Sequence, residues 1–154
     1  MTGGRVGGWT GGVVRALLLL LPVYPSTRLP VLSAQTTDSL IASAQRVARA
    51  WRAHDFAGLL EGSREVTLRL PGADPSQPLG PGRVTELLRA FVGTSREAQV
   101  EVEVARVVDS LRAYVEIRRT YLVRPRAEPR TETVYVGMRR SGQGYAVSEI
   151  RVIR

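Results

Sequence analysis

Four stretches of alternating apolar and polar residues in the last third of the chain constrain its fold more than any other feature. They are Gln99–Val104, Ala113–Val123, Thr133–Met138 and Gly144–Arg154. Successive side chains of a β-strand point to opposite faces, so each stretch predicts a strand with one buried face. Turn-forming residues separate them at Asp109–Ser110 and Ser141–Gly144, and the two prolines of Arg124–Pro129 predict an exposed loop. We therefore expect an antiparallel meander.

The chain before the meander predicts two helices joined at a corner. Thr37 or Asp38 can cap the first helix. Its apolar residues recur at spacings of three and four and share one face: Leu40, Ile41, Ala44, Val47, Ala48 and Trp51. Asp55 is a suitable cap for a short second helix, Phe56–Leu60, which Gly62 ends. His54, the only histidine, falls at the corner, where a polar residue is expected without any chemical role.

A first strand and a third helix follow. Val66, Leu68 and Leu70 alternate with polar residues, and Pro71–Gly82 predicts a loop. Pro81 suits the first turn of the next helix. That helix carries an unbroken apolar stripe, which must lie on a sheet: Val84, Leu87, Leu88, Phe91 and Val92.

These elements predict an α+β fold. A curved antiparallel sheet of about five strands wraps around the N-terminal helix, and a second helix packs beside it. The concave face of the sheet is expected to carry Val66, Leu68, Val100, Val102, Val115, Ile117, Val134, Val136 and Met138. Aliphatic side chains of this kind can fill a core or leave a ligand pocket between them.

The N-terminus has the pattern of a secretory signal. Two arginines and no acid precede the apolar run Ala16–Val23, which is far below the roughly 20 residues that span a bilayer. We expect residues 1–34 to be a signal peptide, cleaved after Ala34, and residues 35–154 to form one exported domain in the periplasm or outside the cell. A retained disordered leader, or a start codon placed too early, is the alternative.

Composition excludes several classes of site. The chain has no cysteine and one histidine, so neither a metal site nor a cofactor is expected. All 22 basic residues are arginines, and the formal net charge is +8. The arginines are scattered and do not interleave with aromatic residues, which disfavours nucleic-acid binding.

Several short patterns resemble those of a known superfamily. They are Ala50-Trp-x-x-x-Asp55-Phe-x-x-Leu59, Val66-x-Leu-x-Leu-Pro-Gly72, Val84-x-x-Leu-Leu-x-x-Phe-Val92 and Gly144-Tyr-x-Val-x-Glu-Ile-Arg-Val152. The first resembles the helix-corner motif of the nuclear-transport-factor-2-like superfamily, whose fold is an α+β cone. Together they resemble a group of small exported bacterial proteins that carry a domain of unknown function. The resemblance covers residues 38–154, but Gly80-Pro81 replaces the usual Ser or Thr before the third helix.

The resemblance leaves three functions open. The one we favour is a non-catalytic binding or assembly module that takes a small apolar ligand and pairs through its sheet into a homodimer. The second is an enzyme of the ketosteroid isomerase or polyketide cyclase type, which needs a buried carboxylate and an oxyanion donor. The third is recognition of an acidic polymer or an anionic lipid surface through the arginines.

The enzyme hypothesis depends on the register of the last strand. Unbroken alternation would point Glu149 inward beside Tyr145 and Val147, near Arg119 or Tyr121. A β-bulge would instead bury Ile150 and Val152 and turn Glu149 outward, and we favour the bulge because those aliphatics need burial. Glu149 is the catalytic candidate, and the pocket-lining candidates are Trp51, Arg119, Tyr121 and Met138.

Overall fold

The computed structural model describes residues 32–123 and 128–154, with side chains from residue 37 onward. Residues 1–31, which are most of the expected signal peptide, and residues 124–127 of the loop lie outside these residues, whereas residues 32–34 of the expected signal peptide lie in the first helix. Within the described chain no helix is long and apolar enough to cross a membrane.

The described residues form three helices and five strands. In order they are α1 (Leu32–Ala53), α2 (Phe56–Leu59), β1 (Thr67–Arg69), α3 (Pro81–Val92), β2 (Ser95–Val107), β3 (Arg112–Val123), β4 (Pro129–Ser141) and β5 (Gly144–Ile153). The sheet order is β1-β5-β4-β3-β2. β2 to β5 form the expected antiparallel meander, whereas β1 pairs in parallel with β5, so the open sheet is mixed.

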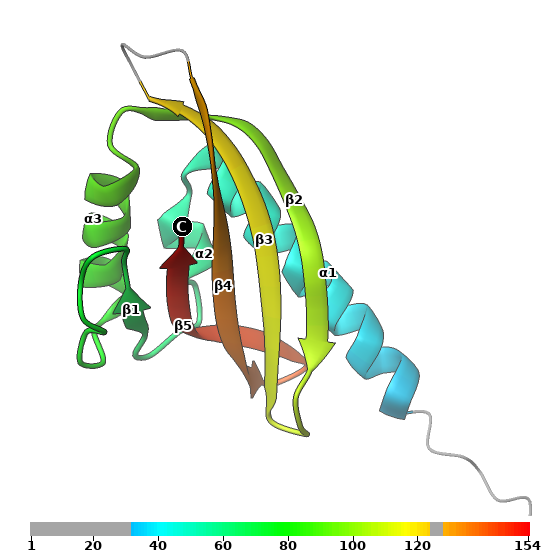
Figure 1. Ribbon diagram of the computed structural model, residues 1–154. Helices are drawn as coiled ribbons and strands as arrows, with labels where there is room; N and C mark the ends of the chain where they lie inside the picture. The colour runs from blue at the N-terminus through cyan, green and yellow to red at the C-terminus, as the bar shows by residue number, and fades with distance from the viewer. Residues whose placement is uncertain (1–31, 124–127) are drawn as a thin grey trace, which may run out of the picture.

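The sheet curves around α1, as Figure 1 shows, and α1 packs against β2, β3 and β5. The predicted caps are present: the Asp55 side chain accepts a hydrogen bond from the Gly58 N–H at the start of α2, and Pro81 opens α3. The aliphatic residues expected on the concave face, except Val102, join the helices in one core with Trp51, Phe56, Leu59 and Leu88. The α+β cone predicted from the sequence is confirmed.

The last strand contains the bulge. Gly137 lies opposite Glu149 and the adjacent Met138 lies opposite Val147, so Ser148 is an extra residue in β5. Val147 points inward on one side of the bulge, and Ile150 and Val152 are buried on the other. Glu149 therefore faces away from the core, as the need to bury these aliphatics predicted.

Four details differ from the predictions. Ile41 is exposed because it lies on the edge of the apolar stripe of α1. The helix α1 already begins at Leu32, so Thr37 and Asp38 do not cap it. Val102 is exposed because β2 is an edge strand with a register shift beside this residue. Pro129 is part of the β4 ladder, which a proline can join because it is the first residue of the strand.

Candidate functional site

A cluster of charged side chains is buried where β2, β3 and β4 meet at the wide end of the cone, near the top of Figure 1. At its centre is Arg119, whose side chain is 1% exposed. Its Nη1 lies 3.0 Å from Glu97 Oε1, and its Nε lies 3.2 Å from Glu132 Oε2. Glu97 is 2% exposed and Glu132 is 1% exposed, so one guanidinium links two buried carboxylates.

Three further side chains complete the cluster. The Tyr121 hydroxyl and Arg154 Nε both donate to Glu132 Oε1, at 2.9 and 2.7 Å. The hydrogen bond to Glu132 also raises the pKa of Arg154 above its usual value. On the other side, His54 Nε2 lies 2.9 Å from Glu97 Oε1. Besides Arg119, Glu132 therefore has two further polar partners and Glu97 has one.

The backbone brings these residues together in three ways. Arg119 and Glu132 are direct cross-strand partners in the β3–β4 ladder. A register shift between Glu97 and Gln99 turns Glu97 toward the interior. His54 directly follows α1 and has a φ of 54°, a left-handed conformation that is common after helix ends and that costs free energy in a residue with a Cβ.

Aromatic rings enclose the guanidinium of Arg119. Its Cζ lies 4.0 Å from the ring centre of Tyr121, 5.6 Å from that of Phe91 and 5.8 Å from that of Trp51. Trp51 in turn packs edge-to-face on Phe56. Cation–π attraction is stronger away from water, so these rings help to stabilise the buried charge.

Several buried polar atoms in this region make no hydrogen bond within the described chain, among them Glu97 Oε2 and Trp51 Nε1. An unpaired buried polar atom costs free energy, and such atoms mark places where water or a ligand group can bind. The cluster therefore offers an acceptor and a donor that the fold does not use.

A shallow cavity of about 230 Å³ opens beside the cluster, and we call it the mouth cavity. It lies between the end of α3 and the start of β2, and its walls include Phe91, Arg119, Tyr121, Arg130 and Arg154. Three arginines and two aromatic residues thus line a small open volume.

The structure separates the predicted site residues into two groups. Trp51, Arg119, Tyr121 and Met138 are all buried, but only Arg119 and Tyr121 line the mouth cavity. Met138 is part of the filled aliphatic core. Glu149 lies apart from all four: its side chain is 38% exposed and its Oε1 is 3.0 Å from Arg151 Nε on the outer face.

Sequence reasoning missed His54, Glu97 and Glu132. Glu132 shares the alternation of Val134 and Val136, so its inward direction could have been predicted. The inward direction of Glu97 could not have been predicted, because the register shift beside it has no marker in the sequence. His54 was expected at a helix corner and lies there, but its ring contacts a carboxylate 43 positions away along the chain.

Within residues 37–123 and 128–154, no group of three His, Asp or Glu residues could hold a metal ion.

The strain at His54 can be measured. Glycine adopts a left-handed conformation without the steric cost that a Cβ brings, so we expect His54→Gly to be more stable than His54→Ala by about 1 kcal/mol. Both variants lack the imidazole, so the lost contact with Glu97 cancels in the comparison. Urea unfolding of the two variants tests this, and equal stability would contradict the assignment of strain.

With this geometry known, the chain can be compared with solved structures. No family model and no curated protein sequence matches it. A DUF4783 family protein from Bacteroides uniformis superposes with a TM-score of 0.59 at 14% identity, over 71% of this chain and 94% of that one. A ketosteroid isomerase-like protein from Erwinia carotovora atroseptica gives a TM-score of 0.61 at 15% identity, over 75% and 92%.

A third neighbour names the fold. It is an NTF-2-like protein of unknown function from Shewanella oneidensis, with a TM-score of 0.54 at 11% identity over 75% of this chain and 97% of that one. This chain has the nuclear-transport-factor-2-like fold. At such identities the likeness concerns the fold, which hosts domains of unknown function as well as ketosteroid isomerase-like proteins.

Proposed function

We propose that this nuclear-transport-factor-2-like protein is an exported, non-catalytic binding module, and that its mouth cavity takes a small organic anion. The observation that carries the proposal is the group of three arginines in the cavity wall. Arg119 and Arg154 pair with buried carboxylates, and the exposed Arg130 is the guanidinium that would receive the ligand. Guanidinium groups bind carboxylates with two parallel hydrogen bonds, and Phe91 provides an apolar surface for the rest of the ligand.

The structure changes the expected ligand chemistry. A small apolar ligand was expected between the aliphatic residues of the concave face, but these side chains pack into one core with the helices. The mouth cavity lies instead at the wide end, where three of the ten residues that line it are arginines. A ligand with a negative charge suits these walls better than a purely apolar one.

Benzoate is a suitable probe, with benzamide as its uncharged analogue of similar shape. We expect benzoate, titrated into the ¹⁵N-labelled protein, to shift the amide signals of Thr94 and Ser95, which line the cavity. Arg130→Gln should weaken benzoate binding about tenfold, because a hydrogen bond to a charged group contributes about 1.5 kcal/mol. The exposed Arg89 of α3 lies outside the cavity, so Arg89→Gln is the matched control. Equal binding of benzoate and benzamide would contradict the proposal.

Export and self-association belong to the same proposal and need their own tests. The N-terminal pattern supports export, and mass spectrometry of material from the cell envelope should find a chain that starts at Gln35. Retention of Met1 on a cytoplasmic protein would contradict export.

The outer face of the sheet carries a stacked pair, Tyr114 and Tyr135, which supports a homodimer through that face. Light scattering should then give twice the monomer mass, and Tyr135→Asp should give the monomer.

A second candidate function is acid–base catalysis, and Glu97 is the observation that favours it. Its Oε2 is buried without a hydrogen bond, and its Oε1 contacts both Arg119 and His54. A carboxylate of this kind can hold a water molecule or remove a proton beside a carbonyl group. Glu149 no longer suits this role, because it is half-exposed and paired with Arg151.

Isomerisation of a β,γ-unsaturated ketone to its α,β-unsaturated form, followed by ultraviolet absorbance, tests this candidate. Catalysis through Glu97 predicts that Glu97→Gln abolishes turnover while Glu149→Gln leaves it unchanged. Absence of turnover in the unmodified protein, or loss in both variants, would reject it.

A further inference from the structure

The hairpin between β2 and β3 exposes aliphatic side chains at its tip. Leu111 is 66% exposed and Val108 is 54% exposed. The tip is held in shape by Asp109, whose Oδ1 accepts hydrogen bonds from the N–H groups of Leu111 and Arg112, at 2.9 and 2.8 Å. These bonds and the nearby guanidinium of Arg112 lower the pKa of Asp109. Large aliphatic side chains on a fixed, exposed turn are characteristic of contact sites.

Arginines surround this tip. Arg112 lies directly opposite Arg139 in the β3–β4 ladder, and like charges at such positions destabilise a sheet. The backbone N–H of Arg140 donates to the carbonyl of Leu111 at 2.7 Å, which ties the tip to the end of β4. Positive charge and apolar surface are therefore joined in one rigid unit at the end of the sheet opposite the mouth cavity.

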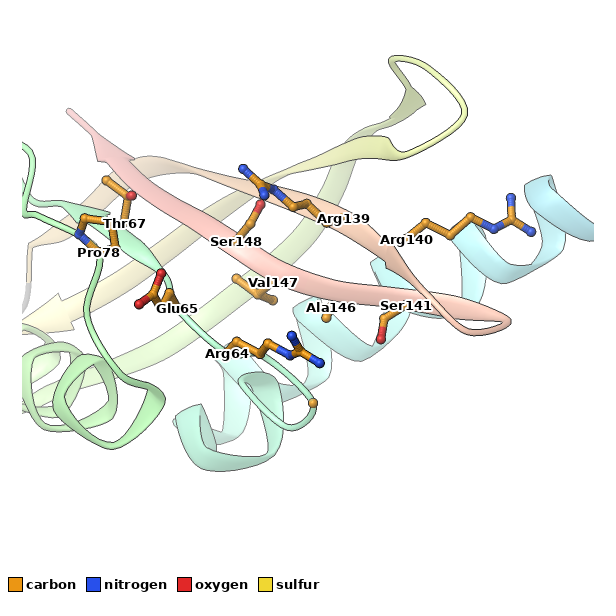
Figure 2. A pocket seen from close by; sticks show the side chains of 11 residues that line it. Arg64, Glu65, Thr67, Pro78, Arg139, Arg140, Ser141, Ala146, Val147 and Ser148 are labelled. Atoms are coloured by element: carbon orange, nitrogen blue, oxygen red, sulfur yellow. The ribbon is translucent and has the colours of Figure 1, made fainter.

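A cavity of about 470 Å³ continues this surface toward β1, and we call it the lower cavity. Figure 2 shows residues that line it: Arg139 and Arg140 come from β4 and Arg64 comes from the loop before β1, and their guanidinium groups lie apart from one another in this view. Thr67, Ser141 and Ser148 add hydroxyl groups, and Glu65 is the one acid among the lining residues. Arginines and hydroxyl groups together are the usual partners of a phosphate group.

We infer that this end of the protein docks on an anionic lipid surface, with Val108 and Leu111 inserted among the lipids and a headgroup phosphate in the lower cavity. The aliphatic tip favours a membrane over a soluble polyanion, because Val108 and Leu111 gain from leaving water only in an apolar environment. The inference is independent of the function proposed for the mouth cavity.

The course of the chain agrees with this orientation. The β2–β3 and β4–β5 turns and the start of α1 lie toward the same end of the molecule, at the bottom of Figure 1. The wide end, with the mouth cavity, faces away from the membrane and stays open to solvent.

The absence of cysteine makes a direct test possible in the full chain. Ser110→Cys places a single thiol at the tip for an environment-sensitive fluorophore, and Gln77→Cys places one in an exposed loop as the control. With phosphatidylglycerol/phosphatidylcholine vesicles we expect the Ser110 label, but not the Gln77 label, to shift to shorter wavelength. Phosphatidylcholine vesicles should give no shift, and added salt should reverse the response.

Two sets of variants separate the charge from the apolar anchor. Arg139→Gln with Arg140→Gln should lower partitioning onto the anionic vesicles roughly 25-fold, because each arginine near such a surface contributes about 1 kcal/mol. Arg49→Gln with Arg89→Gln removes two exposed helix arginines, the same charge, as the control. Val108→Ser with Leu111→Ser should abolish the shift of the tip label. These residues are exposed, so circular dichroism should show an unchanged fold.

Three results would overturn the inference. One is an equal response of the two labels, which would indicate adsorption without a defined orientation. Another is an equal loss of binding in the two arginine pairs, which would indicate an effect of net charge alone. The third is complete displacement from the vesicles by millimolar inorganic phosphate, which would identify the lower cavity as a site for a soluble anion.

Discussion

Arg119→Met is expected to lower the free energy of unfolding by about 3–5 kcal/mol, since it leaves two buried carboxylates without their shared cation. Glu97 and Glu132 are both almost completely buried, so water cannot replace the guanidinium without opening the wide end of the cone. The aromatic contacts of Arg119 with Tyr121, Phe91 and Trp51 are lost as well. Urea unfolding followed by circular dichroism measures the change.

The neighbouring residue provides the control. Arg118 is 55% exposed and pairs with Glu103 on the outer face, so Arg118→Met should cost less than about 1 kcal/mol. Adding Glu97→Gln and Glu132→Gln to Arg119→Met should recover part of the lost stability, because no uncompensated charge then remains in the interior. Similar losses for the two arginine variants would show that the cluster does not stabilise the fold in the way proposed here.

Trp51→Ala is expected to cost about 3–5 kcal/mol, the range for removing a large aromatic side chain from a core. Trp51 is completely buried, contacts Phe56 and lies beneath the charged cluster, so its removal leaves a cavity beside Arg119. A cavity there also weakens the cation–π contacts that help to stabilise the buried guanidinium. Thermal and urea unfolding measure the loss.

Trp51→Phe distinguishes packing from hydrogen bonding. The indole Nε1 makes no hydrogen bond within the described chain, so this variant loses part of the ring volume and no polar contact. We expect Trp51→Phe to lower the free energy of unfolding by less than half as much as Trp51→Ala does. An equally large loss in both variants would mean that Nε1 has a partner, such as a bound water molecule.

The sequence by itself determined the architecture, because alternation and helical spacing depend only on neighbouring residues. The meander, the apolar stripes of α1 and α3, the Asp55 cap and the start of α3 at Pro81 all follow from such local patterns. Even the bulge in β5 was favoured in advance, since Ile150 and Val152 need burial and Glu149 does not. Arg119 and Tyr121 were placed inward by the same alternation.

Only the tertiary structure decided the candidate site. Arg119 is shared between carboxylates from the two neighbouring strands, and His54 reaches Glu97 across 43 positions of the chain, so no local pattern contains the cluster. The register shift that turns Glu97 inward depends on how β2 pairs with β3, and the parallel pairing of β1 depends on where the loop after α2 brings it. Spacing along the chain records which face a side chain occupies, whereas the partners of a buried charge are set by strand register and by the curvature of the sheet.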